Sequence, residues 1–162
     1  MLFQLDLIGR IGLAFLLGAV LGFERESSHR PAGLRTHMLV AAGAAAFTIA
    51  STYGFVGQGT VRDPARVAAQ IVVGVGFLGA GTIWRTPNTI RGLTTAASVW
   101  VVSAVGVLAG SGSYLIAVGL TLAAFGVLRW ARPASRRRGH LGEPSISGEE
   151  PPRGQAPGTR RA

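Results

Sequence analysis

Two carboxylates stand beside the first polar break in an otherwise apolar chain. Glu24 and Glu26 flank an arginine directly after a long uncharged run. Their oxygens suit a hard cation such as Mg²⁺, which favours oxygen ligands and keeps several of its waters. They equally suit ion pairs with Arg30 or Arg35, so the residues leave both interpretations open. The three histidines are scattered and there is no cysteine, so no zinc motif is present and the identity of any metal stays unknown.

A second group of polar residues accompanies the later apolar runs, namely Asp63, Gln70, Thr94, Thr95 and Ser98. Asp63 and Gln70 are seven residues apart and share one helix face, and Thr94 and Ser98 share a face of the next helix. Polar groups in a membrane turn toward protein partners, so one interpretation is a polar pathway or binding site between these two helices. The alternative is structural: Asp63 caps its helix, Gln70 bonds a neighbour, and the hydroxyls bond carbonyls of the preceding turn.

Glycines form the third pattern with chemical meaning. The spacing Gly74-x-Gly76-x-x-Gly79 matches a dinucleotide fingerprint as a string. It lies inside an apolar run without a preceding strand or a downstream acid, so we reject that function. No set of nucleophile, base and orienting group is present either, so we predict no enzyme and no cofactor beyond a candidate Mg²⁺. Close helix packing is expected instead, at Gly18, Gly22, Gly74, Gly76, Gly79 and Gly81.

The elements that must position these residues are long and uncharged. No Asp, Glu, Lys or Arg occurs in residues 36–61 or in residues 92–128. A bilayer accommodates such runs and a soluble fold of this size does not. We therefore predict an all-α integral membrane protein, a bundle of about five transmembrane helices with no soluble folded domain. The expected helices cover about 5–23, 37–55, 65–84, 93–109 and 114–130.

Local signals refine these helices. Asp63-Pro64 predicts a helix start, with Asp as the N-cap and Pro in the first turn. Thr36 is expected to cap the second helix. Asp6 and Arg10 lie one turn apart and are expected to pair.

Charge distribution predicts topology and a tail. Residues 1–130 form the expected transmembrane domain, and residues 131–162 form a basic, Pro- and Gly-rich tail that cannot bury a core and is predicted to be disordered. Ten arginines flank one side of the spans, whereas the other side has Arg10, Arg62 and Arg66. The positive-inside rule then places the N-terminus outside and the C-terminus in the cytoplasm. Because the arginines of this chain of net charge +9 flank apolar runs, we expect no nucleic-acid partner.

Several strings together resemble one family. They cover residues 22–26, 31–37, 63–72, 74–83 and 91–100, in order along most of residues 8–130. In this order and spacing, the chain resembles the MgtC/SapB family. The resemblance adds Arg35 and Arg91, which stand within these strings, to the candidate functional residues. Thr86, Thr94 and Val73 depart from residues usual in the family, and the short tail replaces the soluble C-terminal domain that many members carry.

The resemblance implies a bacterial inner-membrane protein with a five-helix hydrophobic domain and a role in growth at low magnesium. In its pathogen branch it implies survival inside macrophages and restraint of the F-type ATP synthase. Our first hypothesis is a non-enzymatic regulator that contacts another inner-membrane complex, with the bilayer and a second copy of the chain as further expected partners. The alternative is a transporter or channel for Mg²⁺ or another cation. The lack of acidic residues inside the second to fifth helices favours the regulator.

Overall fold

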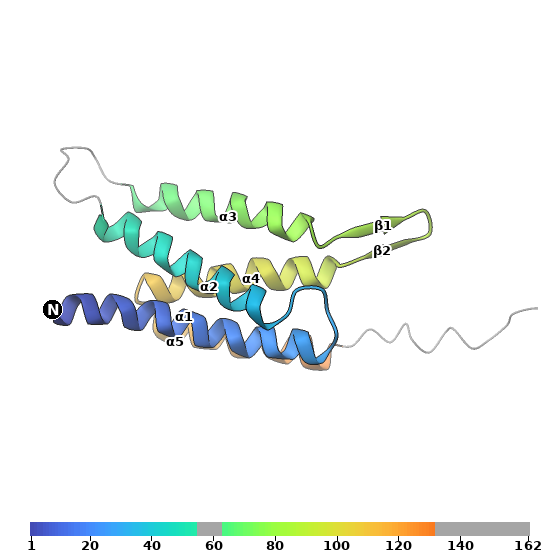
Figure 1. The fold of residues 1–162 in the computed structure, drawn as a ribbon, viewed down its shortest axis with the longest axis horizontal. Helices are drawn as coiled ribbons and strands as arrows, with labels where there is room; N and C mark the ends of the chain where they lie inside the picture. The colour runs from blue at the N-terminus through green and yellow to red at the C-terminus, as the bar shows by residue number, and fades with distance from the viewer. Residues whose placement is uncertain (55–62, 132–162) are drawn as a thin grey trace, which may run out of the picture. The chain divides into compact units, whose positions relative to one another are not determined.

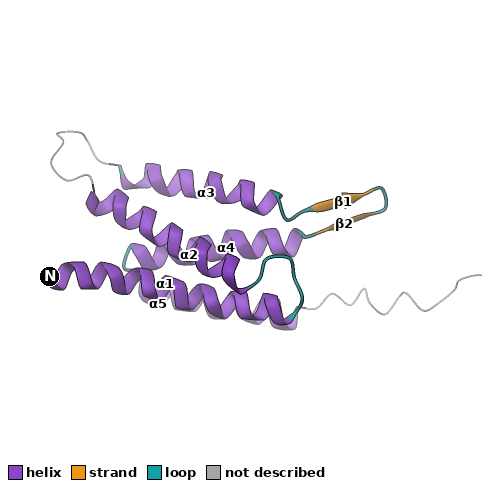
Figure 2. Cartoon of the chain, in the orientation of Figure 1, coloured by secondary structure: helices purple, strands orange, loops and turns teal. Residues whose placement is uncertain are grey.

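The computed structural model describes residues 1–54 and 63–131, which contain five α-helices, one π-helical turn and one short hairpin (Figures 1 and 2). The prediction of a helical protein is confirmed. The elements in chain order are α1 (Leu2–Ser27), α2 (Leu34–Ile49), the π-helical turn η1 (Ala50–Gly54), α3 (Pro64–Ala80), β1 (Trp84–Thr86), β2 (Thr89–Arg91), α4 (Leu93–Gly110) and α5 (Tyr114–Trp130). The expected disordered tail, residues 131–162, lies outside the described residues after Ala131.

The expected helix bounds hold best for the last two helices, whereas α1 ends four residues after its expected end and α3 ends four residues before its own. The ranges of α4 and α5 agree with expectation within one residue, and Asp63 caps α3 as predicted, accepting the amide N–H of Ala65 at 3.0 Å. Thr36, however, is not the cap of α2, because that helix begins two residues earlier. The reason is tertiary: the carboxylate of Glu26, at the end of α1, accepts the N–H of Leu34 at 2.8 Å and so caps the first turn of α2.

The segment between α3 and α4 also differs from the expected plain loop. Residues 84–86 and 89–91 pair as an antiparallel hairpin, with Trp84 opposite Arg91 and Thr86 opposite Thr89. All six strand residues are exposed. In Figure 1 this hairpin extends past the ends of α3 and α4.

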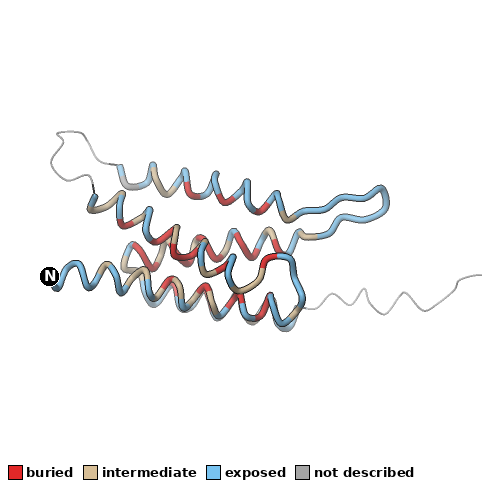
Figure 3. The backbone as a smooth tube through the Cα atoms, viewed as in Figure 1, coloured by how far each residue is buried: buried red, intermediate tan, exposed pale blue. Residues whose placement is uncertain are grey.

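Small side chains hold the bundle together. α2 packs against α1 and α4, α5 packs against α1 and α4, and α3 lies along α2 and α4. Most buried residues belong to α1, α2 and α4, and Figure 3 shows buried positions recurring along the helices. Their central cluster is Ala14, Leu21, Ala41, Ala45, Val102, Val105, Ala109 and Ala117. Five of these eight residues are alanine, whose small side chain lets helix axes approach closely in a bundle held by van der Waals contact in lipid.

Glycines permit the closest of these approaches, although not all of the predicted ones do. A Cβ placed at Gly18 would lie 2.7 Å from the carbonyl oxygen of His37, and one at Gly22 would lie 2.7 Å from the Cα of Leu34. A Cβ at Gly79 would make ordinary contact with Ala96 of α4, and one at Gly81 would meet only carbonyls of its own helix.

The prediction that Gly74 and Gly76 pack against another helix is wrong within this chain, since nothing lies within 4 Å of a Cβ at either. The buried face of α3 is Ile71, Val75 and Gly79, spaced four residues apart. Gly74 and Gly76 lie off this stripe.

Length and composition make two of the helices candidate membrane spans. α1 and α4 are long and apolar enough to cross a membrane. Two shorter apolar helices accompany them, Ala65–Ala80 and Tyr114–Trp130. Large apolar side chains also face outward, among them Leu16, Phe77 and Leu115. These features agree with a membrane protein.

Candidate functional site

A buried ion pair lies where α1 approaches its end. Glu24 and Arg25 are each 3% exposed and pair with each other. The hydroxyl of Ser28 donates to Oε1 of Glu24 at 3.0 Å, and Nη2 of Arg25 donates to the carbonyl of Leu128 at 3.3 Å. The pair therefore joins the end of α1 to the last turn of α5.

The two candidate carboxylates have separate partners. Glu24 binds Arg25 and Ser28, whereas Glu26 caps α2. Neither pairs with Arg30 or Arg35 among residues 1–54 and 63–131, so the interpretation as ion pairs with those two arginines is not supported. No cluster of three or more metal-ligating side chains occurs within the same ranges. A shared Mg²⁺ site at Glu24 and Glu26 therefore lacks geometric support.

A buried histidine is the polar residue that sequence reasoning missed. The His37 ring is fully buried, with Nδ1 3.0 Å from the carbonyl of Gly33 and Nε2 3.1 Å from the hydroxyl of Ser98. Because a carbonyl can only accept, Nδ1 carries the proton, and Nε2 of the neutral ring then accepts from Ser98. The only signal in the sequence was that His37 ends one of the family-like strings.

Ser98 has two acceptors for one proton. Its hydroxyl lies 3.1 Å from Nε2 of His37 and 2.8 Å from the backbone carbonyl of Thr95. Thr95 and Ser98 are both buried on the face of α4 that meets α2. A hydroxyl donates one hydrogen bond at a time, so this proton is shared between the ring and the carbonyl.

Of the two interpretations of these polar residues, the structural one is supported for Asp63, which caps α3, and for Ser98, which donates to the carbonyl of Thr95. The polar pathway between the third and fourth helices is not formed. Ser98 bonds His37 of α2 and not a residue of α3. Gln70 is exposed on α3 and faces the side of α2, and Thr94 is exposed. Spacing along the sequence suggested that the polar faces of α3 and α4 meet. They point to different neighbours, because packing sets the rotation of each helix about its axis.

The remaining candidates lie on the surface. Asp63 is exposed at the start of α3 and its carboxylate serves as the cap. Arg35 is exposed in the first turn of α2, and Arg91 is exposed at the end of β2. The structure thus buries Thr95 and Ser98 and joins Ser98 to His37, and leaves Asp63, Gln70, Arg35 and Arg91 apart from them.

A second polar cluster occupies the opposite end of α1. Arg10 binds Asp6 at 2.7 Å, which confirms the predicted pair. Arg10 also donates to the carbonyl of Gly110 at 3.2 Å and to the hydroxyl of Tyr53 at 3.4 Å, and Tyr114 donates to Asp6 at 3.4 Å. These contacts tie α1 to η1 and to the turn between α4 and α5.

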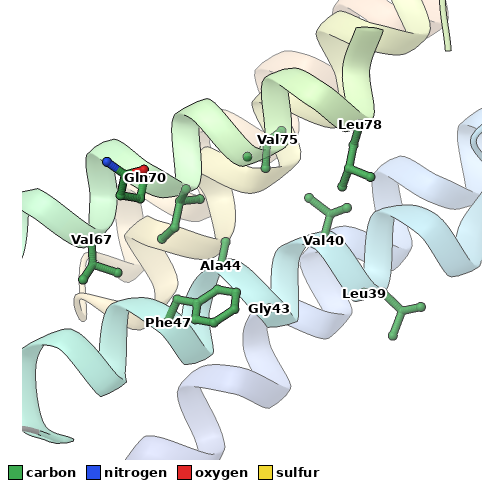
Figure 4. Close-up of a pocket in the computed structure, with 11 residues that line it drawn as sticks. Leu39, Val40, Gly43, Ala44, Phe47, Val67, Gln70, Val75 and Leu78 are labelled. Atoms are coloured by element: carbon green, nitrogen blue, oxygen red, sulfur yellow. The ribbon is translucent and has the colours of Figure 1, made fainter. Parts of the chain in front are cut away.

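An apolar groove separates α2 from α3. Its volume is about 500 Å³, and Figure 4 shows side chains from both helices along it. The lining residues are Leu39, Val40, Gly43, Ala44 and Phe47 of α2, and Val67, Gln70, Ile71, Gly74, Val75 and Leu78 of α3. Gln70 is the one polar side chain among them.

Comparison with known families matches residues 11–137 to the model of the MgtC family. The chain belongs to the MgtC family. It is 54% identical over 99 residues to "Protein MgtC" of Brucella abortus (strain 2308), which covers 61% of this chain and 40% of that protein. It is 48% identical over 109 residues to "Protein MgtC" of Salmonella typhimurium (strain LT2), covering 67% and 45%.

Another relative carries a functional name. The chain is 44% identical over 117 residues to "Putative magnesium transporter YhiD" of Escherichia coli (strain K12), covering 70% of this chain and 54% of that protein. This MgtC-family chain therefore spans about half the length, or less, of these curated relatives. No solved structure matches it.

Proposed function

We propose that this MgtC-family protein is a non-enzymatic, multi-pass protein of the bacterial inner membrane that acts in magnesium homeostasis and adaptation to low Mg²⁺. It does so by regulating another membrane complex, such as the F-type ATP synthase. Family membership and the magnesium-related name of a relative support the biological setting. The regulatory mechanism rests on the arrangement of charges.

One observation carries the choice of a regulator. Helices α2, α3, α4 and α5 contain no Asp or Glu. The described carboxylates sit at helix ends, where Glu24 binds Arg25, Glu26 caps α2 and Asp6 binds Arg10. A Mg²⁺ ion that crosses a bilayer, even with part of its water shell, is stabilised by polar or negatively charged groups along its path. Along their length, helices α2 to α5 place no carboxylate that could bind a divalent cation.

The second candidate function is Mg²⁺ transport, which the printed name of the Escherichia coli relative favours. The two functions differ in a direct measurement. The purified protein is reconstituted into liposomes that enclose a Mg²⁺-sensitive dye, and its gene is expressed in a strain that lacks its own family member. We expect restored growth at low magnesium without Mg²⁺ entry above that of protein-free liposomes. Entry that scales with the amount of protein would establish the transporter instead.

Asp63 gives a test of a charged functional residue. Its carboxylate caps α3 and stays exposed, and asparagine caps a helix nearly as well, whereas alanine costs about 1 kcal/mol. We expect Asp63→Asn and Asp63→Ala both to lose growth at low magnesium while protein levels stay normal, because the negative charge binds a cation or a basic partner. Growth rescued fully by Asn but not by Ala would leave Asp63 as a helix cap alone.

The proposed topology has five spans, with the N-terminus outside and the C-terminus in the cytoplasm. Arg30, Arg35, Arg85 and Arg91 are exposed in segments assigned to the cytoplasmic side, as the positive-inside rule requires. Reporter fusions after Gly33 and after Arg138 are expected to report the cytoplasm, and one at Gly59 the outside. A cytoplasmic signal at Gly59 would contradict five spans.

A further inference from the structure

The groove between α2 and α3 is long and apolar. Its wall on α2 runs from Leu39 to Phe47, a rise of about 12 Å at 1.5 Å per residue. Its volume of about 500 Å³ leaves room for flexible apolar chains along that length.

Glycines keep the middle of the groove open from both walls. Nothing lies within 4 Å of a Cβ placed at Gly43 on α2 or at Gly74 on α3. Leucine at either position would extend into the groove without displacing backbone. Apart from Gln70, the lining side chains are apolar, so a bound group must be a hydrocarbon along most of its length.

A positive charge stands at one end of this hydrocarbon path. Arg35 lies one helical turn before Leu39, the first groove residue of α2, and Thr36 lies one turn before Val40. Both residues are exposed. Arg35 forms no ion pair with any carboxylate of residues 1–54 or 63–131. A guanidinium beside a hydroxyl is a donor set that suits a phosphate oxygen.

We propose that the α2–α3 groove binds an anionic phospholipid, with acyl chains against Gly43 and Gly74 and the phosphate at Arg35. Basic pockets between membrane helices bind anionic head groups in this way. The inference requires that the chain sits in a bilayer, but it does not depend on any role in magnesium homeostasis.

The chain offers matched controls for both halves of the site. Arg129 is exposed on α5 at the same end of the bundle, since Arg25 bonds the neighbouring Leu128. α5 packs against α1 and α4 and contributes nothing to the groove. Gly119 on α5 also has nothing within 4 Å of an added Cβ. Arg129→Gln and Gly119→Leu therefore repeat the two chemical changes away from the groove.

The test is native mass spectrometry of the full chain, purified in mild detergent and mixed with phosphatidylglycerol or phosphatidylcholine. We expect preferential retention of phosphatidylglycerol. Arg35→Gln should lower that retention about fivefold, the effect of roughly 1 kcal/mol for one arginine near an anionic lipid. Arg129→Gln should leave it unchanged. Gly43→Leu should lower the retention of both lipids because its side chain fills the groove, whereas Gly119→Leu should not. Gly74→Leu fills the groove from α3 and should have the same effect as Gly43→Leu.

Other occupants have distinct masses. A retained second copy of the chain, or another polypeptide, that is lost with Gly43→Leu would replace lipid as the occupant and overturn the proposal. Equal retention of the two lipids, or equal effects of the two arginine variants, would overturn it as well. Each measurement uses purified protein, so the result is independent of growth at low magnesium.

Discussion

Replacing Gly106 with leucine should abolish the accumulation of folded protein in the membrane. Gly106 is buried on α4, where a Cβ would collide with the carbonyl oxygen of Ala41 and lie 2.9 Å from the Cβ of Ala44, both on α2. A backbone carbonyl cannot rotate aside as a side-chain end can. Overpacking a close contact costs about 1–3 kcal/mol, and more where backbones must separate, against a total stability of only about 5–15 kcal/mol.

Two matched replacements separate packing from the general effect of a larger residue. Gly119→Leu and Gly76→Leu add the same side chain to helices, at positions with nothing within 4 Å, so both should accumulate normally. Protein in the membrane fraction and melting in detergent solution provide the measurements. Normal levels and melting of the Gly106 variant would show that α2 and α4 do not approach closely in the membrane.

The contrast between Gly106 and Gly76 shows what spacing alone can predict. The dense glycines of residues 74–81 suggested close packing, yet Gly74 and Gly76 face open space in this chain. Gly106 and Gly110, four residues apart in a plainer run, make the tight contacts with α2. Small residues indicate only that two helix backbones can approach closely without a clash. Which face of a helix is used depends on residues far away in the sequence.

Elements were predictable to the extent that their causes are local. Long apolar runs ended by Gly and Ser define α4 and α5, and Asp63-Pro64 defines the start of α3. The start of α2 was not predictable, because its cap comes from Glu26 eight residues earlier. The hairpin of β1 and β2 was also missed. Its three-residue strands are too short to give a period-two pattern.

The candidate site followed the same rule. Ser98 and Thr95 were predicted to be polar residues of interest. Both are buried, and Ser98 bonds His37, which lies 61 residues away in the sequence. This contact could be predicted only from the knowledge that α2 packs against α4. The expected link to Gln70 and Thr94 failed because Gln70 lines the groove beside α2 and Thr94 is exposed. Residue type therefore identified members of the buried cluster, but spacing could not identify their partners.

Glu24→Gln should strongly destabilise the protein, by about 3–5 kcal/mol, because it leaves Arg25 buried without its counter-ion. The guanidinium of Arg25 cannot lose its proton in a protein, and its side chain is only 3% exposed. The double variant Glu24→Gln with Arg25→Met removes both charges and should recover much of this loss. Glu26→Gln is the matched control, since Glu26 is exposed and an amide oxygen can still accept the N–H of Leu34.

Thermal melting of the detergent-solubilised variants, followed by tryptophan fluorescence, compares the stabilities of Glu24→Gln, the double variant and Glu26→Gln. Growth at low magnesium measures function in parallel. Rescue of melting by the double variant would assign Glu24 to neutralising Arg25, and would account for one of the two carboxylates at this end of α1 without a metal. If Glu24→Gln melts like Glu26→Gln, the ion pair is not what holds Glu24 in place. Loss of growth at unchanged melting would then make Glu24 a functional carboxylate. In that case the region where α1 meets α5 would be the next place to search for the partner complex.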